Sequence, residues 1–154
     1  MSEVPETVEV KRAQLQILLH GVIVLLIGLL CGVPYGHAIT HGWGEDAVRA
    51  WRFAHLGLLV GGIWLLAVAG VSHLLVLNAR TVSVLAWSLV ASAYGFTVAL
   101  VLAAVSGVRG LEPTGPFANF VVFLANAVGA FGALVGVVLM VVGTRAALCN
   151  AARG

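Results

Sequence analysis

Four long apolar runs constrain this chain more than any other feature of its sequence. They lie at about residues 15–39, 53–78, 81–107 and 117–144. As a helix, each is long enough to cross a bilayer core of about 30 Å, and none alternates every second residue as a barrel strand does. Because 61% of the residues are hydrophobic and 9% are charged, most of the chain must have lipid as its solvent. We therefore predict an all-α membrane protein. It would be one integral membrane domain over residues 1–154, an antiparallel bundle of four transmembrane helices that forms oligomers.

The residues outside these runs predict how the chain sits in the membrane. Residues 1–12 are polar and contain a proline, so we expect a short disordered or interfacial leader that is not cleaved as a signal peptide. With four spans, both termini share one side. The cations on that side are Lys11, Arg12, Arg80, Arg145 and Arg153, and those on the other side are Arg49, Arg52 and Arg109. Five against three favours cytoplasmic termini, and a net charge of +2 is too small to indicate nucleic acid.

Within the runs, proline and small residues predict kinks and close packing. Pro34 should kink or end the first helix. Residues 78–81 form a short connection, which predicts a hairpin of the second and third helices. Small side chains recur on one face of the third run and of the fourth run, so these faces should pack against protein.

Four of the five histidines lie in or at the ends of the first two runs, namely His20, His37, His55 and His73. Polar side chains are costly in lipid and usually face the interior of the bundle. In an antiparallel pair, His37 and His55 would share the outer level and His20 and His73 the inner level. One interpretation is ligation of haem iron, and the other is that these are interfacial or hydrogen-bonded histidines of the core.

His55 has the most suggestive surroundings of the four, in the stretch Trp51-Arg-Phe-Ala-His-Leu-Gly57. A neutral imidazole can bind a metal through one nitrogen while the other donates a hydrogen bond that fixes its tautomer. Gly57, and then Gly61 and Gly62, leave bare backbone that a flat macrocycle could approach closely.

Other polar residues offer weaker candidates, each with a structural alternative. Arg109 could hold a haem propionate or anchor its loop at the lipid headgroups. Asn126 could contact substrate, although an interhelical hydrogen bond is the commoner role. Tyr94 could donate to a ligand or simply pack with a local hydrogen bond. Because the acidic residues near the spans, Glu45, Asp46 and Glu112, all lie outside the runs, a cofactor should supply any chemistry.

Several short motifs resemble the bacterial styrene oxide isomerase family over nearly the whole chain. They are His20-Gly21, Trp51-x-x-Ala54-His55-x-Gly57, Arg109-Gly110-Leu111 and Phe131-Gly132. The resemblance implies a homotrimer in the bacterial inner membrane that binds haem b near its subunit interfaces. It also implies that His55 is the axial ligand of the iron, with Trp51, Gly57 and Arg109 around the cofactor.

The reaction that this resemblance implies is a Meinwald rearrangement of a small apolar epoxide. Ferric haem acts there as a Lewis acid, the benzylic C–O bond opens towards a carbocation, and a 1,2-hydride shift gives the aldehyde. An apolar, water-poor pocket suits such chemistry, because a metal withdraws charge without proton transfer and the cation is protected from water.

The chain departs from the family at three positions on the substrate side. The family's asparagine, aspartate and tyrosine correspond to Gly61, Ser92 and Leu100. Tyr94, Ser92 or Asn126 would then have to orient the substrate, or the substrate differs.

Two other functions fit the same residues. One is a bis-histidine cytochrome b that transfers electrons, with His37 and His55, and also His20 and His73, clamping haem. The other is a structural or transport protein without a cofactor. An open coordination position on the iron would separate the isomerase from the cytochrome.

Overall fold

In the computed structural model, which describes residues 4–153, four long helices account for most of the chain. They are α1 (Val4–Thr40), α2 (Glu45–Val71), α3 (Ala79–Ser106) and α4 (Phe117–Ala151), and a short 3-10 turn, η1 (Ser72–Leu74), follows α2. All four are long and apolar enough to cross a membrane, and no strand occurs among these residues. The prediction of an all-helical chain with four membrane-length helices is confirmed.

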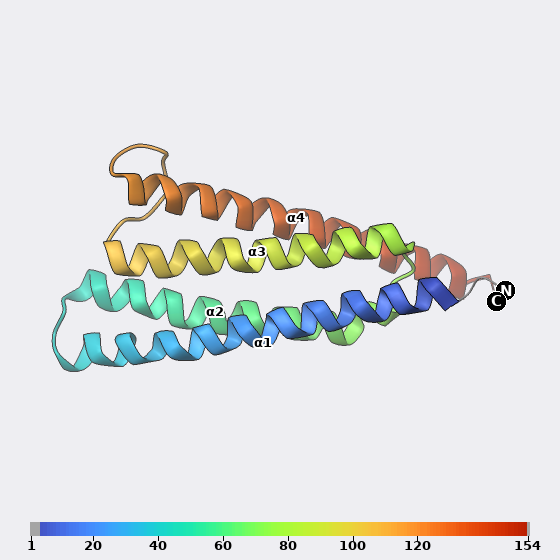
Figure 1. The fold of residues 1–154 in the computed structure, drawn as a ribbon, viewed down its shortest axis with the longest axis horizontal. Coiled ribbons are helices and arrows are strands. Elements are labelled where there is room, and N and C mark those ends of the chain that lie inside the picture. The colour runs from blue at the N-terminus through green and yellow to red at the C-terminus, as the bar shows by residue number, and fades with distance from the viewer. Residues whose placement is uncertain (1–3, 154) are drawn as a thin grey trace.

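The helices associate as two closely packed pairs, α1 with α2 and α3 with α4 (Figure 1). Residue numbers rise along α1 as they fall along α2, since Gln14 hydrogen-bonds the carbonyl of Ala69 whereas Gly28 faces Leu58. Among the helices, α4 packs chiefly on α3. The start of α1 and the end of α4 lie at the same end of the bundle.

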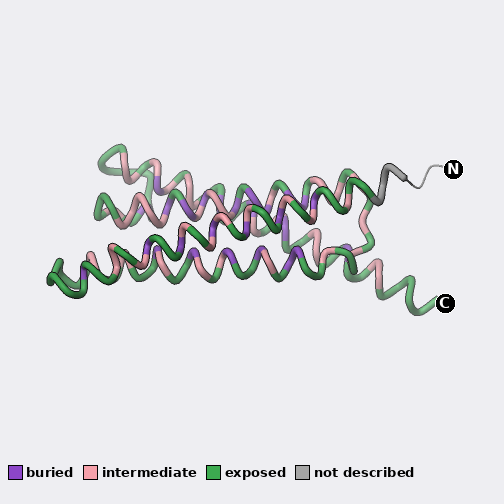
Figure 2. Tube along the Cα trace, turned by 60° about the horizontal axis from the view of Figure 1, so that its bottom comes forward, coloured by how far each residue is buried: buried purple, intermediate pink, exposed green. Residues whose placement is uncertain are grey.

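The buried residues lie where the helices face one another, as the purple positions of Figure 2 show. One cluster joins α1, α2 and α3 near the end of the bundle where α1 begins, around Ile17, Leu65 and Leu89. A second cluster, around Val24 and Leu58, lies nearer the other end. Most of the remaining apolar surface faces outward, as lipid requires.

Glycines set the spacing within the α3–α4 pair. A Cβ added to Gly95 would lie 2.7 Å from the backbone nitrogen of Gly129, and one added to Gly132 would lie 2.5 Å from the carbonyl oxygen of Ser88. The hydroxyl of Ser92 donates to the carbonyl of Gly129 across the same contact at 2.7 Å. The predicted small-residue faces therefore meet each other, in the close approach typical of membrane helices.

Two predictions about α1 left alternatives open, and the structure excludes one alternative of each. The helix does not end at Pro34, because it continues to Thr40. Breaking it earlier would expose backbone groups to lipid, and at its end the Thr40 hydroxyl donates to the carbonyls of Gly36 and His37. Nor is the leader disordered from residue 4 onward, since α1 already begins at Val4. Extending an existing helix through polar residues costs little. Residues 1–3 of the predicted leader lie outside the described part.

The ends of the other helices also differ from the predicted bounds. Glu45 and Asp46 form the first turn of α2, where acidic side chains favour a helix N-terminus. At its other end α2 stops at Val71, and the extended chain after η1 crosses α4 at Gly143, whose carbonyl accepts a hydrogen bond from Val76. The predicted bounds of α3 are nearly right, whereas α4 runs seven residues beyond residue 144.

We expect Gly95→Ala to destabilise the bundle, because the added methyl meets backbone atoms of α4 that cannot rotate away. Overpacking of this kind costs about 1–3 kcal/mol. The measurement is the free energy of unfolding in mixed micelles, with tryptophan fluorescence as the probe of unfolding. Gly70→Ala in α2 is the matched control, since nothing lies within 4 Å of its added Cβ. Equal stability of the two variants would contradict the α3–α4 contact described above.

Candidate functional site

The candidate site begins at the closest contact between α1 and α2. A Cβ added to Gly28 would lie 2.9 Å from the backbone nitrogen of Leu59 and 3.0 Å from the backbone carbonyl carbon of Leu58. No other residue type would let the two backbones come this near. The contact brings the carbonyl of Gly28 within reach of a side chain one turn earlier on α2.

That side chain is His55. Its Nδ1 lies 2.8 Å from the carbonyl oxygen of Gly28. Because a carbonyl oxygen can only accept, Nδ1 must carry the proton and donate it. The neutral ring then has its lone pair on Nε2, the nitrogen that remains to bind a metal. This is the arrangement of a metal-ligating histidine held by a backbone carbonyl.

The surroundings of the imidazole fix its position further. A Cβ on Gly32 would lie 3.1 Å from both Cε1 and Nδ1 of His55, so the ring occupies space that only glycine leaves open. The ring of Tyr35 stacks on it, with centroids 6.0 Å apart and planes inclined by 25°. His55 itself is half-buried, which leaves part of the ring accessible from outside the α1–α2 pair.

Trp51 is one of the other residues predicted to surround a cofactor. It precedes His55 by four residues, on the same face of α2, and packs on the cluster of Val24, Ala54 and Leu58. Gly57 points instead towards α3, where an added Cβ would lie 3.0 Å from Cδ1 of Leu100.

The bare backbone expected beyond Gly57 is only partly available. Gly62 is covered by α1, with the backbone nitrogen of Leu25 2.8 Å from the position of an added Cβ. Nothing lies within 4 Å of the corresponding position at Gly61. Of the three glycines in this stretch, Gly61 is therefore the one that leaves open space.

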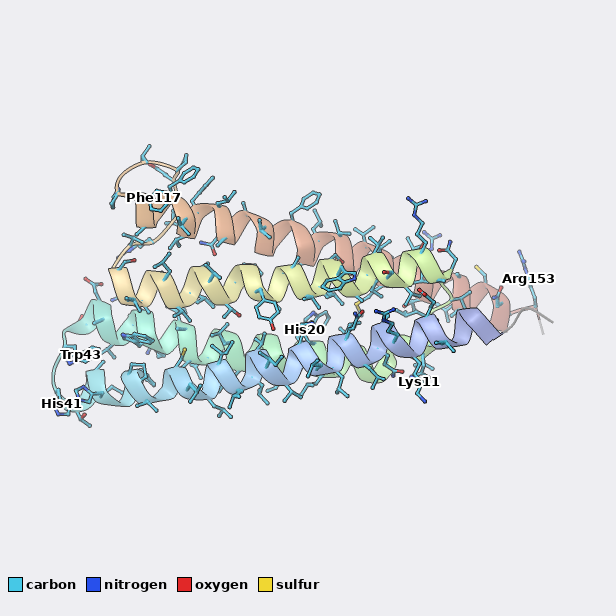
Figure 3. All side chains as sticks on the ribbon, viewed as in Figure 1. Lys11, His20, His41, Trp43, Phe117 and Arg153 are labelled. Carbon is cyan, nitrogen blue, oxygen red and sulfur yellow. The ribbon has the colours of Figure 1, made fainter. Side chains whose placement is uncertain are left out.

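The other histidines occupy separate neighbourhoods. His37 stacks on His41 at a centroid distance of 3.8 Å, beside Trp43 in the first connection. Figure 3 shows His41 and Trp43 at one end of the molecule and Lys11 and Arg153 at the other. The structure therefore does not bring His37 onto His55.

His20 and His73 do not share a level, contrary to the expectation from sequence. His20 lies beside Gly21, which faces Leu65, whereas His73 lies beyond Ala69. The seven or eight residues between these levels correspond to about 11 Å along the helix axis. Instead, Nδ1 of His20 lies 3.0 Å from the hydroxyl oxygen of Tyr94, and His73 is exposed in η1.

The three residues proposed to orient a substrate do not converge. Tyr94 is engaged with His20 between α1 and α3. Ser92 is buried, with its hydroxyl used in the α3–α4 contact. Asn126 is half-buried on α4, and its amide makes no hydrogen bond to any residue from 8 to 153. None of the hydrogen bonds of these three side chains involves His55.

Arg109 lies in the connection between α3 and α4, where its guanidinium is 3.9 Å from the carboxylate of Asp46. Both side chains are largely exposed, so this ion pair contributes little to stability. The connection is held chiefly by Asn119, whose side chain accepts from the backbone of Gly110 and donates to the carbonyls of Glu112 and Thr114.

Gly28, Gly32 and Tyr35 were missed by the sequence analysis. The signal for the first two was present, since Gly28 and Gly32 form a small-xxx-small step in the first apolar run. What the sequence does not contain is the register of α1 against α2, which decides that this step lies opposite His55.

Comparison with known families gives a match. A family model described as Styrene oxide isomerase matches residues 13–145. The match spans all four helices, including His55 and the glycines opposite it. No curated protein matches the chain, and no solved structure matches it.

We expect His55 to be the Nδ1-protonated tautomer, because its Nδ1 faces a carbonyl oxygen. Nitrogen NMR of histidine-labelled protein in micelles, without added metal or cofactor and in mildly alkaline buffer, distinguishes the two neutral forms. The signal of His55 is the one that disappears in His55→Gln. Protonation of Nε2 instead would contradict the bond to Gly28.

Proposed function

Because the chain belongs to the styrene oxide isomerase family, we propose that it is a haem b-binding membrane isomerase that converts a small apolar epoxide to an aldehyde. The observation that carries this proposal is the hydrogen bond from His55 to Gly28, which leaves Nε2 of a half-buried imidazole to bind iron. Bound ferric haem would supply Lewis acidity for opening the epoxide, followed by a 1,2-hydride shift.

The residues around His55 fit a histidine that would hold the iron of haem. Porphyrin brings four nitrogen donors, so the protein needs to supply only one strong ligand and can leave a position open. Among the described residues, no group of three or more histidine, cysteine or acidic side chains lies together. The space at Gly32 accommodates one imidazole, and the carbonyl acceptor at Gly28 fixes its tautomer.

The chain itself would contribute three effects at this site. The carbonyl of Gly28 orients His55 and makes its ring a better donor to the iron. Trp51 would border the cofactor one turn away, and Gly57 would border it on the side of α3. The apolar residues packed around Trp51 keep water from the site, which favours rearrangement over hydrolysis.

Substrate orientation is proposed to involve Asn126 before Tyr94 or Ser92. The amide of Asn126 is the one that remains available for a new hydrogen bond, whereas the hydroxyls of Tyr94 and Ser92 are engaged with His20 and Gly129. Because α3 lies between α2 and α4 (Figure 1), Asn126 would approach the site of a neighbouring protomer. A homotrimer with haem near its interfaces would allow this.

For the membrane, we propose an antiparallel bundle in the bacterial inner membrane with both termini cytoplasmic. Lys11 and Arg153 lie at one end of the molecule (Figure 3), and that side carries five cations against three. Apolar epoxides partition into lipid, so the substrate would enter laterally from the bilayer. A bis-histidine cytochrome finds no corresponding support, since His37 stacks on His41 rather than facing His55.

We expect His55→Ala to abolish haem retention, because no other side chain presents a free imidazole nitrogen at this place. His73→Ala is the matched control, since His73 is exposed in η1. Both variants are purified in detergent and assayed for haem as the pyridine haemochrome and for turnover of styrene oxide. Wild-type protein should show ferric haem with an exchangeable coordination position. Equal haem loss in both variants, or a bis-histidine spectrum, would contradict the proposal.

We expect Gly32→Ala to weaken haem binding about tenfold, the scale found when a residue that orients a metal ligand is changed. Its added methyl would lie 3.1 Å from the imidazole and displace the ring. Gly36→Ala, one turn further along α1, is the control, because nothing lies within 4 Å of its Cβ. The measurement is a titration of haem-free protein with haemin. Similar haemin affinities of the two variants would show that the space at Gly32 is not needed to position His55.

A further inference from the structure

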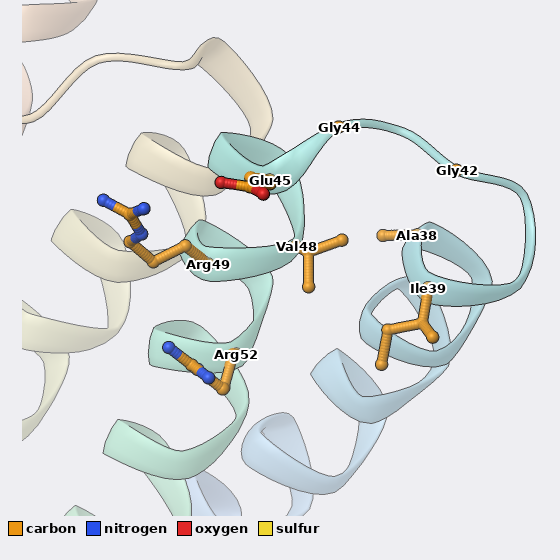
Figure 4. Close-up of a pocket in the computed structure, with 8 residues that line it drawn as sticks. All are labelled: Ala38, Ile39, Gly42, Gly44, Glu45, Val48, Arg49 and Arg52. Carbon is orange, nitrogen blue, oxygen red and sulfur yellow. The ribbon is translucent and has the colours of Figure 1, made fainter.

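A pocket of about 520 Å³ lies between the end of α1 and the start of α2 (Figure 4). It is lined by Ala38, Ile39, Gly42, Gly44, Glu45, Val48, Arg49 and Arg52. Two of these side chains are cations, and Figure 4 shows both guanidinium groups on the side of α2 away from Ile39. The pocket is therefore apolar towards α1, and along α2 it carries the two guanidinium groups and the carboxylate of Glu45.

Arg52 is the cation nearest to His55 along the helix. It precedes His55 by three residues, which places it on a neighbouring part of the same face, about 4.5 Å along the axis. Arg49 lies a further turn away and is rotated by about 120° from His55. A flat ligand held by His55 would therefore present its edge to Arg52 first.

Arg52 also makes no salt bridge to a described carboxylate, although Glu45 lines the same pocket. The residues four positions before and after it are Val48 and Leu56, both apolar. Among the described side chains, the ion pair within 4.0 Å is the one between Arg109 and Asp46. An exposed guanidinium beside a membrane-embedded site, with no described carboxylate within 4.0 Å of it, is suited to an anion from outside the chain.

We propose that Arg52 binds a carboxylate of the cofactor held by His55, which for haem b is a propionate. This inference rests on the proposed function, and it assigns to Arg52 the role that sequence alone gave to Arg109. A carboxylate near the bilayer needs a cation to offset its desolvation, and guanidinium can bind it through two parallel hydrogen bonds. Arg109 is less suited, because it lies in the connection between α3 and α4, beside Asp46 in the first turn of α2, nine residues from His55.

The test titrates haem-free protein with haemin and with haemin dimethyl ester, whose propionates carry no charge, and follows the Soret absorbance. Arg52→Gln should weaken haemin binding about tenfold, as expected for loss of one charge-assisted hydrogen-bonded contact, and should leave the affinity for the ester unchanged. Arg52→Lys should recover part of the loss. Arg49→Gln, in the same pocket, is the matched control and should bind both porphyrins as the wild type does.

Each other outcome overturns a defined part of the inference. Equal loss for haemin and its ester would mean that Arg52 acts through structure rather than through the carboxylate. Loss in Arg109→Gln but not in Arg52→Gln would return the contact to Arg109. Unchanged haemin affinity with reduced retention of phosphatidylglycerol would assign Arg52 to a lipid phosphate. If the wild type binds neither porphyrin, the proposed function itself is wrong. This result differs from one in which the wild type binds haemin and Arg52→Gln binds it equally well, which would disprove only the role of Arg52.

Discussion

The contact of His55 with the backbone of Gly28 is the interaction on which the proposed site depends. It requires two helices to approach until a side chain of one reaches a carbonyl of the other, and Gly28 makes that approach possible. In lipid the alternative to this bond is an imidazole without a partner, which costs more than it would in water. The same bond that satisfies the histidine in the membrane therefore also fixes which nitrogen can bind a metal.

The number and approximate position of the helices could be predicted from the sequence because bilayer thickness sets their length. Their ends could not, because the ends lie outside the lipid, where other effects decide. Acidic residues extend α2 back to Glu45, and polar residues extend α1 back to Val4. The early end of α2 at Val71 accompanies a contact with Gly143, about seventy residues away in the chain. Hydropathy along one segment carries no information about such a contact.

The candidate site likewise has a part that could be predicted from the sequence and a part that could not. His55 stood out because local spacing and family resemblance both mark the stretch from Trp51 to Gly57. Its hydrogen-bond acceptor, Gly28, did not stand out, because it is one of 19 glycines. Only the register of α1 against α2 shows that this glycine lies opposite His55. The expected pairing of histidines by level failed for a related reason. A shift of two turns between helices separates His20 from His73 and leaves His20 with Tyr94.

The two helix pairs carry different parts of the proposed chemistry, and this constrains how such a protein could work. The α1–α2 pair holds His55 and Arg52, whereas the α3–α4 pair carries Asn126 and Ser92. Each pair is locked internally by glycine contacts, so its own residues are held rigidly. Alignment of substrate against cofactor then depends on how one pair meets the other, within a protomer or between protomers. Under the proposed function, substitutions at those contacts should change which epoxide is accepted without changing how the iron ligand is held.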